Sequence, residues 1–333
     1  MNQTGRSDLA CRGADTVGNS GIPRSLPGQA HGRLWRVILL SSIALCPLRN
    51  VFAERQAPTT DTQLVKQSLN ALSSLISVPF ENDIDFRIGP EKKGWRYSLQ
   101  CIPVIPVSLN KDWNLITRIV VPFIDQTDVF AQPALAVPTA PSGPTVRGGV
   151  PVAPPVHLPT IGRNQTGLGD IPILPWFSPE KPGPGGWIWG IGPAFVLPTA
   201  TDPLLGSEKW SAGPTFIITK QQGPWTFGLI ADQVWSFAGA HSHPNISQAF
   251  VYPYIFYTTQ KKTTFAINTE STYDWFHHQW IVPINAEVAQ FVRIFGMPLN
   301  IAIGGRIYAD GPHGNPEWGL RFTVQAIFPR QPR

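Results

Sequence analysis

The last clear pattern in the chain is a strict alternation of side chains from Glu317 to Phe328. One face would carry Trp318, Leu320, Phe322, Val324, Ala326 and Phe328, and the other Gly319, Arg321, Thr323, Gln325 and Ile327. A period of two is that of a β-strand. An apolar face opposite a face with charged and polar groups fits a barrel with lipid outside and water inside. We therefore expect Trp318 at the outer membrane interface, Phe328 at the inner one, and Arg321 and Gln325 in the lumen.

Similar alternation recurs through the chain, separated by Gly, Pro, Asn and Asp. We predict strands near residues 83–89, 95–107, 112–123, 167–177, 187–197, 210–219, 225–237, 248–258, 263–273, 279–292, 298–308 and 317–328. Twelve is an even number, as closed antiparallel barrels require, and short connections largely alternate with longer ones. The fold class expected is all-β: a transmembrane antiparallel β-barrel of about 12 strands with a short N-terminal helix.

Aromatic side chains recur on single strand faces ten residues apart, as in the pairs Trp225 and Trp235, and Trp318 and Phe328. Ten residues at about 3.4 Å each, tilted by about 45°, rise roughly 24 Å, close to the ~25 Å apolar band between aromatic girdles. Chance in an aromatic-rich chain is the competing explanation. The predicted girdle is Trp113, Trp225, Trp235, Trp275, Trp318 and Phe328.

The N-terminal part predicts export. Arg33 and Arg36 precede an apolar stretch and a small-residue end at Ala53, which is the pattern of a signal peptide. A buried segment of the mature fold is the alternative. We expect residues 1–53 to be an upstream extension and signal peptide, cleaved after Ala53, residues 54–82 a periplasmic segment with a helix over Thr60 to Val78, and residues 83–329 the barrel. The helix would plug the periplasmic mouth or lie at the membrane interface.

Composition and charge narrow the class of protein. The chain has 35 prolines, 30 glycines and 14% charged residues, which disfavours a helix-rich enzyme. Residues 1–53 hold six arginines against two aspartates, so their removal lowers the formal charge from +5 to +1. We therefore predict no nucleic-acid partner. The same cleavage would leave Cys101 as the one cysteine, without a disulfide or a cysteine metal site.

Several strings resemble a family of proteobacterial outer-membrane proteins that are labelled transporters, and in places neuromedin U. They are also similar to outer-membrane proteins of phenol (meta-pathway) degradation operons. The strings run over Leu64 to Asp83, Val104 to Ile124, Gly186 to Asp202, Asn268 to Trp275 and Pro316 to Pro329. The resemblance implies an outer-membrane barrel but supplies no substrate. A Pro-rich stretch at 131–160 departs from the family and reads as a loop insertion, either a plain surface loop or a ligand for a partner.

Catalytic and cofactor motifs are scarce, so we predict no enzyme, no cofactor and no metal. The Gly-rich stretch Lys181 to Trp187 lacks the Lys and Ser/Thr of a phosphate loop and predicts a turn. Histidines occur in two pairs, and exposed loop histidines are the simpler explanation for them. A rim hydrolase built from Ser242, His241 and Asp274, or from His277 and His278, stays as an alternative.

The parity of the strands predicts a set of lumen-facing polar residues, which would either pair with one another or line a pore. They are Arg118, Asp232, Glu270, Glu287, Arg306, Arg321 and Gln325. We predict a channel or transporter for small, hydrophobic or aromatic solutes, with a non-conducting structural or adhesive barrel as the rival. The expected partners are outer-membrane lipid, small-molecule solutes and the barrel-assembly machinery.

Overall fold

The structure is a computed structural model that describes residues 60–130 and 164–328. The predicted signal peptide at 1–53 and the Pro-rich stretch at 131–160 lie outside the described residues. The helices are α2 (Asp61–Ser68) and the 3-10 turn η2 (Pro184–Gly186). The strands are β1 (Ile76–Ile88), β2 (Gly94–Cys101), β3 (Val104–Ser108), β4 (Trp113–Ile119), β5 (Val121–Thr127), β6 (Asn164–Leu168), β7 (Ile171–Pro179), β8 (Trp187–Leu197), β9 (Lys209–Gln222), β10 (Trp225–Gly239), β11 (Ser247–Thr258), β12 (Thr263–Thr269), β13 (Ser271–Asp274), β14 (Gln279–Ile294), β15 (Met297–Asp310) and β16 (Trp318–Phe328).

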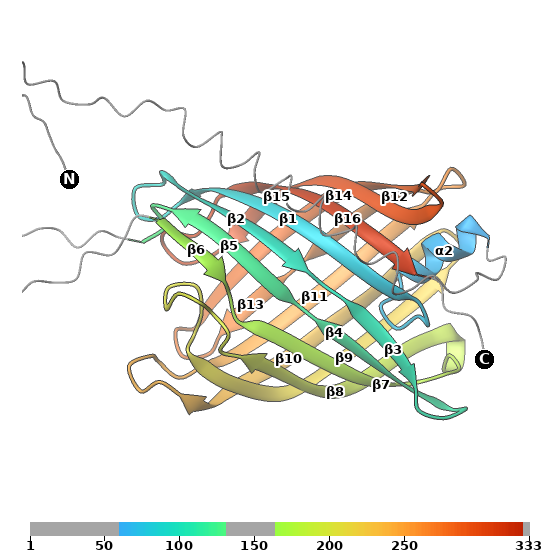
Figure 1. Ribbon diagram of the computed structural model, residues 1–333, viewed down its shortest axis with the longest axis horizontal. Coiled ribbons are helices and arrows are strands. Elements are labelled where there is room, and N and C mark those ends of the chain that lie inside the picture. The colour runs from blue at the N-terminus through green and yellow to red at the C-terminus, as the bar shows by residue number, and fades with distance from the viewer. Residues whose placement is uncertain (1–59, 131–163, 329–333) are drawn as a thin grey trace, which may run out of the picture. The chain divides into compact units, whose positions relative to one another are not determined.

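These segments form one closed antiparallel sheet (Figure 1). Closure comes from β1 pairing with β16, in a register that sets Asp83 opposite Arg321. Four strands are each interrupted once, so β2 and β3, β4 and β5, β6 and β7, and β12 and β13 are the two halves of single strands. Pro103 contributes to the first break because it has no N–H to donate. The barrel therefore has twelve strands, which confirms the predicted fold class.

The two ends of the barrel differ in their connections. One end has short turns at 109–112, 223–224, 259–262 and 295–296, and we call it the short-turn end. At the turn after β14, Phe295 and Gly296 both have positive φ, 51° and 80°, as in the two-residue hairpins that match strand twist. The other end, the long-loop end, carries the connections 198–208, 240–246 and 311–317, together with two short ones at 89–93 and 275–278. One longer connection, 180–186, lies at the short-turn end. Alternating short and long connections are typical of outer-membrane barrels.

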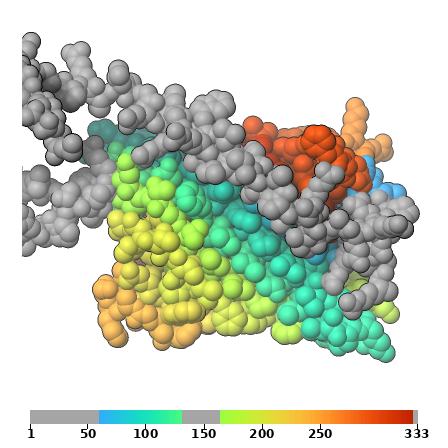
Figure 2. All heavy atoms as spheres, in the orientation of Figure 1, coloured from blue at the N-terminus to red at the C-terminus, as the bar shows by residue number. Residues whose placement is uncertain are grey.

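The outward face of the wall is apolar and exposed. Trp235 of β10 and Ile303 of β15 expose 49% and 69% of their surface. Arg321, which points inward from β16, exposes 2%. Figure 2 shows the teal, green and yellow strands of one face packed side by side. Large apolar side chains that point outward from a closed sheet are what lipid contact requires.

The N-terminal prediction was wrong in its length. Thr60 caps α2, with its side chain and that of Gln63 forming a reciprocal capping box, but α2 ends at Ser68. The prediction of a helix to Val78 failed because β1 already begins at Ile76, seven residues before the predicted start of the barrel. The backbone N–H and C=O groups of β1 form hydrogen bonds with β16 on one side and with β2 on the other. These bonds stabilise a strand despite the helical spacing of the apolar residues. None of the helices among the described residues is long and apolar enough to cross a membrane.

Candidate functional site: the barrel interior

A network of charged side chains covers one wall of the interior, formed by β1, β14, β15 and β16. Arg321 donates to Asp83 through Nε, at 2.7 Å, and through Nη2, at 2.9 Å. Its Nη2 also donates to Oε2 of Glu270 at 2.8 Å, and Arg306 reaches that same oxygen at 2.8 Å. Arg306 donates in addition to Oδ1 of Asn285 at 2.7 Å. Such charge-assisted pairs, with several hydrogen bonds each, offset the cost of burying the charges.

Three further carboxylates lie at the edge of this network. Glu81 and Glu287 each have an oxygen 3.7 Å from Nη1 of Arg321, and Asp85 has one 3.7 Å from Nη1 of Arg306. Five carboxylates therefore share two guanidinium groups. The charged wall, as we call the network of Glu81, Asp83, Asp85, Glu270, Glu287, Arg306 and Arg321, has more acidic than basic groups.

Two glycines make room for the arginines. Gly304 pairs with Arg321 across the β15–β16 ladder, and Gly319 pairs with Arg306. A Cβ at position 304 would lie 2.4 Å from the carbonyl oxygen of Ala286, and one at 319 would lie 2.4 Å from Oδ1 of Asp85. The register of β15 and β16 thus pairs each of the two arginines with a glycine on the neighbouring strand, which leaves space for the long side chain.

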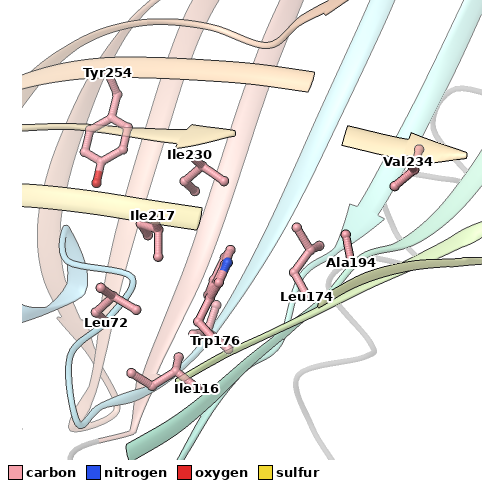
Figure 3. Packing of buried hydrophobic residues seen from close by; sticks show 10 residues of the cluster. Leu72, Ile116, Leu174, Trp176, Ala194, Ile217, Ile230, Val234 and Tyr254 are labelled. Atoms are coloured by element: carbon pink, nitrogen blue, oxygen red, sulfur yellow. The ribbon is translucent and has the colours of Figure 1, made fainter. Parts of the chain in front are cut away.

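The opposite wall is apolar. Its buried side chains are Val104, Ile116, Leu174, Trp176, Ala194, Ile217, Ile230, Val234 and Tyr254, together with Leu72 from the segment before β1. Figure 3 shows Leu72 beside Trp176 and Ile116, with Ile217 on the other side. Trp176 is fully buried, and its indole N–H donates to Thr215 at 3.1 Å. We call this cluster the apolar wall.

Strand β11 carries a ladder of aromatic rings between the two walls. The ring centroids of Tyr252 and Tyr254 are 5.5 Å apart, and those of Tyr254 and Phe256 are 5.0 Å apart. Phe250 continues the row at 6.3 Å from Tyr252. Gly228, opposite Tyr254 on β10, leaves the space that this ring covers, because a Cβ there would lie 2.5 Å from the tyrosine hydroxyl.

The segment from α2 to Leu75 plugs the short-turn end, where Figure 1 shows α2 beside the start of β1 and the end of β16. Its apolar contacts form a second cluster of Leu64, Val65, Leu75, Phe291 and Ile327. Asp61 pairs with Lys262 at 2.8 Å and with Arg293 at 2.9 Å. Gln221 donates to the carbonyl of Lys66 at 2.6 Å. We call residues 60–75 the plug.

A cavity of about 180 Å³ lies above the plug, between the charged wall and the aromatic ladder. Ser68, Leu69 and Ala71 of the plug form part of its lining. The charged groups in the lining are Glu81, Glu287, Arg118 and Arg321, and the aromatic ones are Tyr252, Tyr254 and Phe256. Polar groups on an otherwise apolar lining are typical of small-molecule sites.

The structure brings most of the predicted lumen residues together. Glu270, Glu287, Arg306 and Arg321 belong to the charged wall, whereas Arg118, Glu287, Arg321 and Gln325 line the cavity. Gln325 donates to the carbonyl of Ser68 in the plug at 3.3 Å. Asp232 is half-buried and makes no ion pair within 4.0 Å among residues 60–130 and 164–328, although Arg118 is near enough to act on its charge. Of the predicted girdle, Trp113, Trp225, Trp235, Trp275 and Trp318 are exposed and Phe328 is partly buried.

Sequence reasoning missed three acidic residues and the aromatic ladder. Glu81, Asp83 and Asp85 share one face of β1, but the polar Asn82 interrupts the apolar face opposite, and a helix assignment that reached Val78 hid the start of the strand. Tyr252, Tyr254 and Phe256 alternate with Val251, Pro253 and Ile255, so both faces of β11 are apolar and the alternation did not indicate which one points inward.

Among the described residues, no hydrogen bond joins Ser242 to His241 or to Asp274, the partners predicted for a rim hydrolase. Nδ1 of His277 lies 2.7 Å from Oδ2 of Asp274, while Ser242 has His243 as its side-chain neighbour at 3.4 Å. His243 pairs in turn with Glu208 at 3.1 Å. Within the ranges that the structure describes, no three His, Cys, Asp or Glu side chains are grouped so that they could hold a metal ion.

Comparison with solved structures places this architecture among bacterial outer-membrane proteins. The COG4313 outer membrane channel from Pseudomonas putida F1 superposes with a TM-score of 0.52 at 13% identity, covering 77% of this chain and 96% of that one. The fold is that of an outer-membrane β-barrel. The NanC porin and the β domain of the Bordetella autotransporter BrkA give TM-scores of 0.38 and 0.35, at 10% and 8% identity, with 77% and 75% of this chain covered and 100% and 99% of theirs. No family model matches the chain, and no curated protein matches it.

Proposed function

We propose that the protein is an outer-membrane channel for small solutes, with hydrophobic or aromatic compounds as its cargo. One observation carries the proposal: a closed barrel with an apolar outer face encloses a cavity that is lined by both charged and aromatic side chains. A barrel that served only as an anchor would have no need of such a cavity. The short-turn end with the plug would face the periplasm, and the long loops would face outward.

Passage in this proposal requires the plug to move. Leu72 is 6% exposed and packs in the apolar wall, so the plug and the wall close the lumen together. Among the described residues, the plug is held to the barrel by the two ion pairs of Asp61, by hydrogen bonds from Gln221 and Gln325, and by two apolar clusters, the apolar wall and the cluster around Phe291. A segment held by these contacts opens at a lower free-energy cost than the barrel unfolds.

The direct test is single-channel recording of the purified protein in planar bilayers. We expect brief, small conductance steps for the wild type and longer openings for Leu72→Asn, which introduces a polar group into the apolar wall. Ser73→Asn, in the same segment, is the matched control. An absence of steps for both the wild type and Leu72→Asn, at every voltage, would leave the channel proposal without support and favour a non-conducting barrel.

A cross-link separates movement of the plug from movement of the loops. Asp61→Cys and Lys262→Cys, in a background with all three native cysteines replaced by alanine, would allow a reducible cross-link between the two thiols. That cross-link would join the plug to the turn after β11. We expect cross-linking to abolish the conductance steps and reduction to restore them. Equal conductance in the cross-linked and reduced states would show that the plug does not gate the lumen.

A further inference from the structure

We propose that the cavity above the plug binds a small organic cation, a protonated amine that carries one aromatic or similarly compact apolar group. This inference rests on the proposed function and names the class of solute that the interior recognises. Three features of the lining support it: its size, its free hydrogen-bond acceptors and its aromatic side.

The size of the cavity limits the ligand. Its volume is about 180 Å³. A buried apolar cavity of about 150 Å³ accepts benzene. One ring with a short arm therefore fits, whereas a larger solute would have to displace Leu69 or Ala71 of the plug, both of which line the cavity.

Two carboxylates of the charged wall retain hydrogen-bonding capacity toward the cavity. The hydrogen bonds of Arg321 go to Asp83 and Glu270, while Glu81 and Glu287 stand 3.7 Å from its Nη1. Glu287 accepts one hydrogen bond, from Asn268 at 3.3 Å. Glu81 accepts none from any side chain that the structure describes. An ammonium group, which has three donors and no acceptor, complements such a pair.

A third acceptor is buried in the same lining. Asn300 is 6% exposed, and its Oδ1 has no hydrogen-bond partner among the described residues. Buried polar atoms are normally paired, so a ligand with a donor would satisfy this oxygen once the Asn300 side chain turns toward the cavity that it lines. A carboxylate ligand has no donor to offer this oxygen.

The aromatic ladder supplies the other half of the site. Tyr252, Tyr254 and Phe256 all line the cavity, across from the carboxylates. Aromatic side chains attract cations through the ring quadrupole and bury an apolar group at the same time. A ring-bearing amine would use both walls, whereas a simple inorganic cation would use one.

The one basic group that argues for an anion is Arg118. It lines the cavity from β4, and no carboxylate of the described residues lies within 4.0 Å of it. Counted together with Arg118 and with the partly buried Arg96, which acts on Asp85 from β2, the charged wall has five carboxylates for four guanidinium groups, so the field in the cavity favours a positive ligand by one charge. Arg118 would then weaken the binding of an amine, so its replacement by a neutral residue should raise the affinity for the amine.

Four small ligands separate the contribution of the positive charge from that of the aromatic ring. Isothermal titration calorimetry of the purified protein in detergent micelles would compare benzylammonium, benzyl alcohol, benzoate and methylammonium. We expect benzylammonium to bind about tenfold or more tightly than benzyl alcohol, since hydrogen bonds to charged groups are the stronger ones. Methylammonium should bind weakly because it lacks the ring. Equal affinity for benzylammonium and benzyl alcohol, or tighter binding of benzoate, would overturn the proposal.

Isosteric variants test the assigned residues. Glu81→Gln and Glu287→Gln should each weaken benzylammonium binding about tenfold, while Arg118→Gln should strengthen it. Glu91→Gln, at a side chain that is 75% exposed, is the charge-matched control and should leave binding unchanged. A mobility shift on boiling before gel electrophoresis establishes that each variant is folded. Unchanged benzylammonium affinity in folded Glu81→Gln and Glu287→Gln would also overturn the assignment.

Conductance distinguishes the two proposals. If the protein conducts but binds no amine, the cation site is wrong and the channel stands. If it gives no conductance steps yet binds benzylammonium, the site stands and the channel proposal falls.

Discussion

The charged wall and the apolar wall are both inward faces of one sheet, yet they are stabilised in different ways. On the charged wall, Arg306 and Arg321 are held by ion pairs and by the space beside Gly304 and Gly319. On the apolar wall, Trp176 and Ile217 are fully buried against neighbours and against Leu72 of the plug. One side therefore depends on charge balance and the other on packing, and Leu72 brings the plug into contact with the apolar wall.

The largest expected effect tests the charge balance. Arg321→Met would leave the buried Asp83 and the partly buried Glu270 with Arg306 as their ion-pair partner, and would remove the guanidinium that lies beside Glu81 and Glu287. We expect a loss of about 3–5 kcal/mol in the free energy of unfolding, as when one partner of a buried pair is removed. Urea unfolding in phospholipid vesicles, followed by tryptophan fluorescence, would measure it.

The matched control is Arg87→Met. Arg87 pairs with Glu317 through side chains that are 55% and 44% exposed, so its loss should cost at most about 1 kcal/mol. Equal losses for the two variants would show that the charged wall is not held by its ion pairs.

The second effect concerns the space beside the arginines. Gly304→Ala would bring a Cβ to 2.4 Å from the carbonyl oxygen of Ala286 and 2.5 Å from Cγ of Glu287, so the strands must shift. We expect a loss of about 1–3 kcal/mol, typical of overpacking. Gly305→Ala, on the outward face with nothing within 4 Å, is the control and should be nearly neutral in the same unfolding experiment.

The contrast between the walls also explains how much of the interior could be predicted. Where the inward face is charged, as for Arg306 and Arg321, the alternation of side chains predicts both that the segment is a strand and which of its faces points into the lumen. In β10 the charged residue Asp232 marks the inward face, which Ile230 shares, whereas both faces of β11 are apolar, so Tyr254 could not be assigned to the lumen from the sequence. The ion pairs themselves depend on the pairing of β1 with β16. Asp83 and Arg321 are 238 positions apart in the chain, so no local sequence pattern predicts their contact.

A smaller effect tests whether the apolar wall is packed as tightly as a soluble core. Ile217→Val removes one methyl group from a fully buried position, and we expect a loss of about 0.5–1.5 kcal/mol. Ile218→Val, next in the chain and on the outward face, should cost less because lipid fills the space. Equal losses at 217 and 218 would show that the wall is no better packed than the lipid-facing surface.

The smallest effect concerns the ion pairs that hold the plug to the short-turn end. Hydrogen bonds from Lys262 and then Arg293 hold the pKa of Asp61 below its ordinary value. A lowered pKa in the docked state means that the stabilisation is complete above the ordinary value of about 3.9 and is lost as the pH falls through the lowered one. Asp61 is 30% exposed, so each pair contributes at most about 1 kcal/mol.

We therefore expect the open probability of the wild type in planar bilayers to rise as the pH drops below about 4. Asp61→Asn should already show the raised open probability at pH 6, with a smaller further rise in acid. Asp112→Asn, in an exposed turn at the same end, should behave as the wild type. If Asp61→Asn keeps the wild-type open probability at pH 6, the apolar contacts of Leu64, Leu72 and Leu75 hold the plug without help from charge, and the two apolar clusters control the closed state.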